Sequence, residues 1–464
     1  MTKTLRTKNM NLIRQINLPD DGGTVTLYEN PKADTYVGVG TSELIVHRYA
    51  ARGKIENWVK NFEMIDENNI SKLHPIDMEM GNKILDRIES GENYSNVFIF
   101  YSEDAIESVL PTEKSVEEHT YTSTGIKFWR HQEAMFNYKN GDPNTVISTH
   151  ISPEGSCNLK CPYCSVTYRD THRRLDMVTI QDYVLKLKTR GLKAVILTGG
   201  GEPTSYKYFN DLVRWLKGEG LSVALITNGT LTRRVDDDVW KLFSWIRVSI
   251  NIFDGWEKMI GLPQDKIDYE NTVVGCSMVY TVEHEASDEM MSNRVDLLSK
   301  AAMVADRCGA KYIRLLPNCL LSQYDLIRQH KSLDNTLKEV DDPRFFHQYK
   351  IHGAPQTSKC HQSYFRPYLS EEVDVASGKA GTVYPCDSVV LNDGYAVFAE
   401  EYQLCHATDI LDYIDGKTQQ KFDAQTRCTG CVFTDNVNML DDFIHGKVDR
   451  FAQYDQPLMH EEFV

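Results

Sequence analysis

Of the 464 residues, 41% are hydrophobic and 25% are charged, a composition typical of a globular protein, and the length predicts two to three domains. The net charge of −15 argues against a surface for long nucleic acids, and the run RDTHRR at 169–174 is either a local basic patch or a solvated face. With eleven cysteines, no signal-peptide core and no apolar run near the roughly 20 residues of a membrane span, a cytoplasmic protein is expected.

Residues 1–144 contain no cysteine and are predicted to form an N-terminal α+β domain, in which no chemical motif indicates a role. Strand-like runs lie at 24–29 (TVTLYE) and 96–102 (NVFIFYS). A helical pattern at 77–91 ends at Gly91.

From residue 145, short apolar runs alternate with helical segments. Six strands are predicted, at 145–151, 193–203, 222–229, 245–252, 272–281 and 311–318. Helices are predicted at 179–191, with Thr179 as N-cap and Gly191 as stop, and at 208–220, 236–243 and 294–309. This alternation predicts an α/β fold of parallel βαβ units that curve into a full or partial barrel, assigned to residues 145–340. About 30 polar residues after Asn318 are predicted to be a linker.

Three cysteines follow the first predicted strand, in SCNLKCPYCSVTYRD at 156–170. Cys157, Cys161 and Cys164 would lie on a loop at the end of the barrel where catalytic groups gather. Three thiolates are one short of a closed tetrahedral site. The triplet is therefore either a zinc site with a distant fourth ligand or a centre with an open position.

The next predicted strand ends in TGGGEPT at 198–204, where glycines permit close backbone approach to a ligand and Glu202 supplies a carboxylate. Together, the cysteine triplet and this loop resemble the radical S-adenosylmethionine (SAM) superfamily over roughly residues 145–320. The resemblance implies a partial (βα)6 barrel. It also implies a [4Fe–4S] cluster on Cys157, Cys161 and Cys164, with one iron open to SAM.

Further site residues follow from the same resemblance. It implies SAM contacts by Tyr163, Gly200, Gly201, Glu202 and Pro203, and a polar contact to SAM by Ser249, which could equally be a strand-end hydroxyl bonded to backbone. An electron from the cluster, delivered by a donor such as flavodoxin or ferredoxin, would cleave SAM to a 5′-deoxyadenosyl radical.

Five more cysteines lie in a predicted C-terminal domain at 341–464. A Cys-x2-Cys pair with two distant partners makes a four-thiolate site, for zinc or for iron–sulfur. The pattern resembles the auxiliary-cluster extensions called SPASM and twitch domains, in the shorter twitch-like form. That resemblance implies one auxiliary [4Fe–4S] cluster, held by Cys360, Cys386, Cys428 and Cys431. Cys405 is not assigned to this cluster; it is a substitute ligand, a donor of a hydrogen atom to a substrate radical, or a buried cysteine without a function in the chemistry. Cys276, Cys308 and Cys319 are predicted to be core residues.

The expected function is a redox enzyme that abstracts hydrogen from an unactivated C–H of a peptide or a small polar metabolite, in an oxidation, crosslinking or epimerisation. One alternative is radical modification of a nucleotide or nucleic acid, although the acidic balance counts against a long polymer. Another is a non-catalytic iron–sulfur protein. The intact Gly-Gly-Glu-Pro motif argues against that, because an electron carrier needs no SAM site.

Overall fold

The structure is a computed structural model that describes residues 114–280, 288–321, 323–350, 352–392, 395–448 and 458–464, and four strands between residues 11 and 48. The chain divides into two compact units, Met1–Thr112 with Leu321–Arg328 and Glu113–Leu320 with Gln329–Val464. In the first unit, an antiparallel sheet contains β1 (Asn11–Asn17), β2 (Thr24–Asn30), β3 (Thr35–Gly40) and β4 (His47–Arg48) in that order. β2 confirms the strand predicted at 24–29. The predictions at 77–91 and 96–102 lie outside the described residues.

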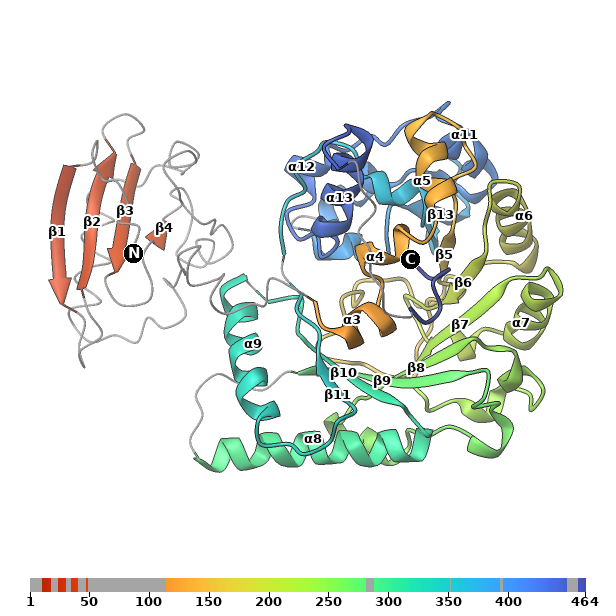
Figure 1. Ribbon diagram of the computed structural model, residues 1–464, viewed down its shortest axis with the longest axis horizontal. Helices are drawn as coiled ribbons and strands as arrows, with labels where there is room; N and C mark the ends of the chain where they lie inside the picture. Colours follow the sequence, from red (N-terminus) through yellow and green to blue (C-terminus); the bar gives the residue numbers. More distant parts are fainter. Residues whose placement is uncertain are drawn as a thin grey trace. The chain divides into compact units, whose positions relative to one another are not determined.

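The second unit is built on a ten-stranded sheet (Figure 1), and all six predicted strands are confirmed in it. They are β5 (Ser148–Ile151), β6 (Ala194–Leu197), β7 (Ser222–Thr227), β8 (Trp245–Ser249), β9 (Val273–Tyr280) and β10 (Tyr312–Pro317). Each is parallel to the next along the chain. The α/β class and the parallel sheet of a partial barrel are therefore confirmed.

Helices α6 (Met177–Lys188), α7 (Phe209–Gly218) and α8 (Asp288–Cys308) connect these strands and lie along the outer side of the sheet in Figure 1. α6 begins earlier than predicted because Asp176, not Thr179, is the N-cap, and its carboxylate accepts a hydrogen bond from the Thr179 N–H at 2.6 Å. The helix predicted at 236–243 is wrong. Only a single 3₁₀ turn forms there, η5 (Val239–Leu242), and its Asp238 cap makes no side-chain hydrogen bond to the turn.

The predicted linker after Asn318 is also wrong. It contains helix α9 (Gln323–Leu337) and strand β11 (Phe345–His347), which extends the sheet in parallel beside β10. The buried positions of α9 include 326, 329, 330 and 333, the spacing of one helix face, but two of them are Gln329 and His330. A buried face that is half polar does not show up as a hydrophobic pattern.

The C-terminal residues continue the same sheet on its other side. β12 (Tyr368–Val373) is parallel to β5, and β13 (Ala380–Tyr384) and β14 (Cys405–His406) follow it in antiparallel pairing. The remaining helices of this region are α10 (Tyr395–Tyr402), α11 (Ile410–Ile414), α12 (Ala424–Arg427) and α13 (Thr434–Ile444). The segments 145–340 and 341–464 thus share one sheet, and the division into three domains stays a prediction.

Residues 113–144, predicted as part of the N-terminal domain, lie in the second unit instead. They form α3 (Val116–Tyr121), α4 (Gly125–Phe128) and α5 (Gln132–Lys139). Phe128, Trp129 and Met135 belong to the core that the barrel and the C-terminal strands share. These residues join the second unit through apolar contacts with residues far away in the sequence. Local composition does not reveal such contacts.

The two faces of the parallel sheet have different neighbours, as the alternation of a β-strand requires. On β6, Val195 and Leu197 pack in the large core with the helices, whereas Ala194 and Ile196 pack on the inner face. The first residues of several strands form an inner apolar layer with Phe463, which closes the N-terminal ends of the strands. No described helix is long and apolar enough to cross a membrane.

Candidate active site

The cysteine triplet lies on the loop that follows β5. Its three thiols are partly exposed and close enough to influence one another. Burial raises the pKa of Cys157. Burial, with Cys164 and Cys157 beside it, raises the pKa of Cys161 to about 12. No three of the described His, Cys, Asp and Glu side chains are arranged as ligands of a single metal ion.

Hydrogen-bond donors point at two of these sulfurs. The Leu159 N–H lies 3.4 Å from the Cys157 Sγ, and the Arg169 guanidinium lies 3.4 Å from the Cys164 Sγ. The same guanidinium donates to the Gly155 carbonyl at 2.8 Å, which fixes its direction. Such donors stabilise thiolates and tune iron–sulfur clusters. The donor set of this loop therefore fits a cluster held by three thiolates.

The glycine loop after β6 is interlocked with the cysteine loop. The Gly201 and Glu202 N–H groups donate to the carbonyls of Glu154 and Ser156 at 2.9 and 2.8 Å. A Cβ on Gly201 would lie 2.1 Å from the Ser156 oxygen, and a Cβ on Gly200 would lie 2.2 Å from the Glu371 Oε1. The glycines are thus required because any side chain at these positions would collide with the cysteine loop or with Glu371. The motif alone indicated only a close approach to a ligand.

Glu202 is buried, and both of its carboxylate oxygens accept hydrogen bonds from the chain. One accepts from the Thr204 and Thr227 hydroxyls at 2.6 and 2.5 Å, and the other accepts from the Asn228 N–H at 2.7 Å. Burial raises the pKa of Glu202, while these bonds lower it. The side chain ties the loop after β6 to the loop after β7, and its contact with SAM stays a prediction. Pro203 opens the 3₁₀ turn η3 (Pro203–Ser205).

Tyr163 and Ser249 are brought together by a residue that sequence reasoning missed. The Tyr163 hydroxyl donates to the Asn251 Oδ1, and the Asn251 amide lies 3.4 Å from the Ser249 carbonyl. Asn251 lies two residues after the end of β8 and is buried. The cysteine loop is therefore anchored at the end of β8, beside the strand end where a SAM contact was predicted.

A cavity of about 770 Å³ lies beside these loops and is called here the glycine-loop cavity. From the barrel it is lined by Thr198, Gly199, Gly200, Ser165, Val166 and Arg169. From the C-terminal region it is lined by residues that include Glu371, Glu372, Tyr384 and Tyr395.

A smaller cavity of about 400 Å³, the four-cysteine cavity, is lined by Cys360, Cys386, Cys428 and Cys431. Burial raises the pKa of all four thiols, that of Cys360 to about 12. They are thus neutral until a cation displaces their protons. Cys405 is not part of this lining. It is paired with Val383 in the sheet and packs against the core.

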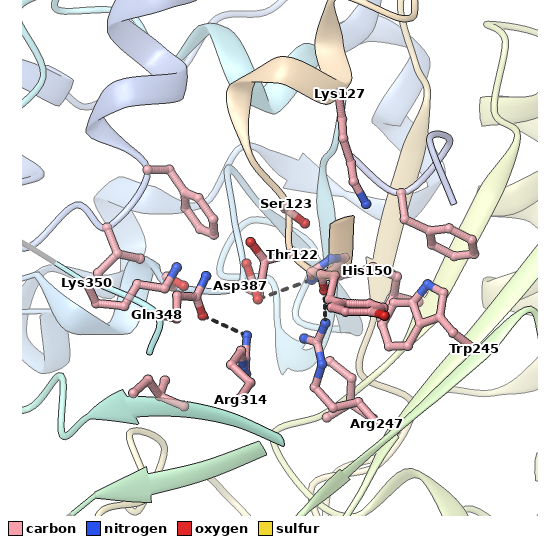
Figure 2. Close-up of a pocket in the computed structure, with 18 of the residues that line it drawn as sticks. Thr122, Ser123, Lys127, His150, Trp245, Arg247, Arg314, Gln348, Lys350 and Asp387 are labelled. Carbon is pink, nitrogen blue, oxygen red and sulfur yellow. Dashed lines mark hydrogen bonds and ion pairs between the residues drawn. The ribbon is translucent and has the colours of Figure 1, made fainter. Parts of the chain in front are cut away.

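A third cavity, of about 980 Å³, lies within the curve of the sheet and is called here the basic cavity (Figure 2). Its lysine, arginine and carboxylate lining consists of Lys127, Arg247, Arg314, Lys350, Arg366 and Asp387. It shares Asp387 and Ser388 with the glycine-loop cavity, and Ser388, Val432 and Phe433 with the four-cysteine cavity.

The sequence analysis did not find the basic cavity. A signal was present, because Arg247 in WIRVS and Arg314 in YIRLLP interrupt otherwise apolar strands, where a charge is rarely buried without a function. Cys319, predicted to be a core residue, lies in the wall of this cavity. Cys276 and Cys308 are core residues, as predicted.

Comparison with known proteins identifies the class of the barrel. The family model described as the radical SAM superfamily matches residues 151–268, and this part of the chain belongs to that superfamily. An S-adenosylmethionine-dependent nucleotide dehydratase of Selenomonas ruminantium is 33% identical over 85 residues, which are 18% of this chain and 30% of the relative. A 7-carboxy-7-deazaguanine synthase of Neisseria meningitidis is 37% identical over 86 residues, 18% of this chain and 38% of the relative. The chain therefore spans well under half the length of these two relatives.

Solved structures match this chain at lower sequence identity. Streptococcus suis SuiB bound to its precursor peptide SuiA is 13% identical with a TM-score of 0.41, covering 84% of this chain and 86% of that one. Native anSMEcpe with bound AdoMet and the Kp18Cys peptide is 15% identical with a TM-score of 0.40, covering 65% of this chain and 97% of that one. These likenesses are too distant to transfer a function.

Proposed function

We propose that the protein reductively cleaves SAM and abstracts hydrogen from an unactivated C–H of a peptide or a small polar metabolite. The observation that carries this proposal is the interlocking of the cysteine loop with the glycine loop, through the Gly201 and Glu202 N–H groups, beside a cavity of about 770 Å³. When bound, the [4Fe–4S] cluster and SAM supply the 5′-deoxyadenosyl radical, with electrons from a donor such as flavodoxin or ferredoxin.

In this proposal the residues of the chain hold the cluster and orient SAM. Cys157, Cys161 and Cys164 would bind three irons, and Arg169 would stabilise the Cys164 thiolate through its 3.4 Å contact. The backbone of Gly199 and Gly200 would lie along SAM, because these residues line the glycine-loop cavity. Asn251 would keep Tyr163 at the end of β8. Each of these groups acts by position, which is the protein's part in cofactor chemistry.

A second cluster in the four-cysteine cavity is part of the proposal. Four buried thiols line one cavity and match the ligand number of a [4Fe–4S] cluster as well as that of zinc, and the resemblance to the auxiliary-cluster extensions favours the cluster. Four thiolates would leave no open iron, so this cluster would transfer electrons or support the substrate. The four-cysteine cavity shares Ser388, Val432 and Phe433 with the basic cavity, which supports a position of the cluster beside that space.

A nucleotide is the second candidate substrate, and one observation favours it. The basic cavity carries five Lys and Arg side chains against one carboxylate, in a chain whose net charge is −15. One partial relative is named as a nucleotide dehydratase. The cavity is lined by separate elements of one fold, which suits a small molecule and not a nucleic-acid polymer.

The test is anaerobic reconstitution with iron and sulfide, followed by iron analysis and measurement of 5′-deoxyadenosine. Wild-type protein should hold about eight irons. Replacing Cys157, Cys161 and Cys164 together by Ala should halve the iron and abolish 5′-deoxyadenosine. Cys405→Ala is the matched control, because Cys405 lies outside both cysteine sites. SAM cleavage that survives in the triple variant would refute the proposal.

A further inference from the structure

The basic cavity brings positive charge from distant parts of the chain into one space. Figure 2 shows Lys127, Arg247, Arg314 and Lys350 pointing toward it from different sides. Arg247 and Arg314 belong to β8 and β10, Lys127 to α4, and Lys350 follows β11. On β8 and β10 these arginines lie two residues beyond Trp245 and Tyr312 of the inner apolar layer, so they form the next layer toward the cysteine loop.

These four cations have no ion-pair partner among the described residues. Arg247 donates to the Tyr121 carbonyl at 2.7 Å and to the Tyr312 hydroxyl at 3.2 Å. Arg314 donates to Ser277 and Gln348, at 2.9 and 3.0 Å. All four acceptors are neutral. They fix the directions of the guanidinium groups and leave the charge uncompensated.

The two lysine ammonium groups make fewer hydrogen bonds than the arginines. Lys127 has one weak contact, at 3.3 Å, to the His460 carbonyl. For the Lys350 ammonium, no acceptor in the described part of the chain lies within hydrogen-bond distance, and its neighbour is the Phe433 ring, with the centroid 5.1 Å away. Burial, with Arg247 nearby, lowers the pKa of Lys127 to about 7.

Asp387, the one carboxylate in the lining, interacts electrostatically with Lys350 and Arg314 but forms an ion pair with neither. It lies 3.2 Å from the His150 ring and 3.6 Å from the Arg366 guanidinium, so it is already engaged with two other bases. Buried cations are otherwise found paired with carboxylates. Glu118 interacts with Lys350 and Arg314, and Glu461 and Glu462 interact with Lys127, but in the described part of the chain none of them forms an ion pair with these cations. A cavity that keeps four cations without a direct carboxylate partner is organised for an anion from outside the chain.

We propose that the basic cavity binds the phosphate group of a small-molecule substrate. The inference rests on the proposed function, because the substrate would extend from this group toward the glycine-loop cavity, which shares Asp387 and Ser388 with it. Two arginine forks and two lysine point charges match a tetrahedral dianion, whereas a single carboxylate would engage only part of them. The acidic exterior does not oppose this, because the cations are inside the fold.

The test is calorimetric titration of the reconstituted holoprotein, saturated with SAM, using inorganic phosphate, pyrophosphate and malonate as probes. Phosphate and pyrophosphate should bind. Lys350→Met and Arg314→Met should each weaken this binding by about tenfold or more, the effect of losing one charged hydrogen bond. Arg190→Met is the control, because Arg190 carries the same charge but pairs with Asp415 outside the cavity, at 2.7 Å.

Lys350→Met has a second readout that a structural role would not give. Because the ammonium has no acceptor, its removal should raise the melting temperature of the anion-free protein while it weakens phosphate binding. Unchanged phosphate affinity in this variant, or no binding of phosphate or pyrophosphate to the wild type, overturns the inference. Tighter binding of malonate than of phosphate overturns the assignment to phosphate. SAM cleavage is scored separately, so phosphate binding without cleavage would refute the proposed function alone.

Discussion

Replacing Glu202 by Gln separates two roles for this residue, a SAM ligand and a clamp between loops. Gln has nearly the same shape, and its carbonyl oxygen can keep the bonds from the Thr204 and Thr227 hydroxyls. Its NH₂ group then faces the Asn228 N–H, which donates to the other Glu202 oxygen at 2.7 Å. Two donors now meet in a buried site.

The expected cost is the loss of one hydrogen bond to a charged acceptor together with an unsatisfied buried N–H, about 2–3 kcal/mol. The assay is denaturant unfolding of the apoprotein, followed by SAM binding to the reconstituted protein. We expect a lower unfolding midpoint and, because the loops remain connected through Thr204 and Thr227, only moderately weaker SAM binding. Glu219→Gln is the control, because Glu219 forms a half-exposed pair with Lys188 at 2.6 Å and should change stability by at most about 1 kcal/mol.

The opposite pattern would refute this reasoning. If Glu202→Gln unfolds like the wild type but no longer binds SAM, then the carboxylate is a direct ligand of the cofactor and the clamp seen here is incidental. If stability and SAM binding are both unchanged, the buried carboxylate contributes to neither, and the hydrogen bonds to Asn228 and the threonines have no energetic weight.

Three further predictions concern the glycine loop, the four-cysteine cavity and Lys127. Gly201→Ala should lower iron content as well as SAM affinity, because its Cβ would lie 2.1 Å from the Ser156 carbonyl oxygen of the cysteine loop. In Gly200→Ala the new Cβ meets the Glu371 side chain instead, so the iron content should fall less. Equal iron loss in the two variants would contradict this. Replacing Cys428 and Cys431 by Ala should remove about half the iron and abolish product while SAM cleavage persists, and zinc without extra iron in the wild type would refute the auxiliary cluster. Lys127 faces Arg247, His460, Glu461 and Glu462, and its pKa of about 7 means that it is largely neutral at pH 8 in the free protein, while Lys350, with a pKa of about 8, is partly neutral there. Phosphate binding should raise both pKa values, so calorimetry in two buffers at pH 8 should show proton uptake that is smaller in Lys127→Met than in the wild type. Wild-type proton uptake in Lys127→Met would exclude Lys127 from the phosphate site.

Local features of the sequence determined the barrel and its cysteine chemistry. The apolar strands and the helices between them have periods that show in short windows, and six strands were predicted within a few residues of β5 to β10. The Cys-x3-Cys-x2-Cys and Gly-Gly-Glu-Pro spacings are equally local. The four C-terminal cysteines that spacing and resemblance selected line one cavity, and Cys405 does not.

Only the tertiary structure decided the rest. Helix α9 was mistaken for a linker because Gln329 and His330 are buried on its packed face, and α3 to α5 join the barrel through contacts with residues more than 200 positions away. The basic cavity has no sequence motif, because Lys127, Arg247, Arg314 and Lys350 come from separate elements of the fold. Their meaning depends on the absence of a direct ion pair between them and any carboxylate among the described residues. The sequence states which charged residues a protein has. Folding decides which of them lie in one buried space without an ion-pair partner.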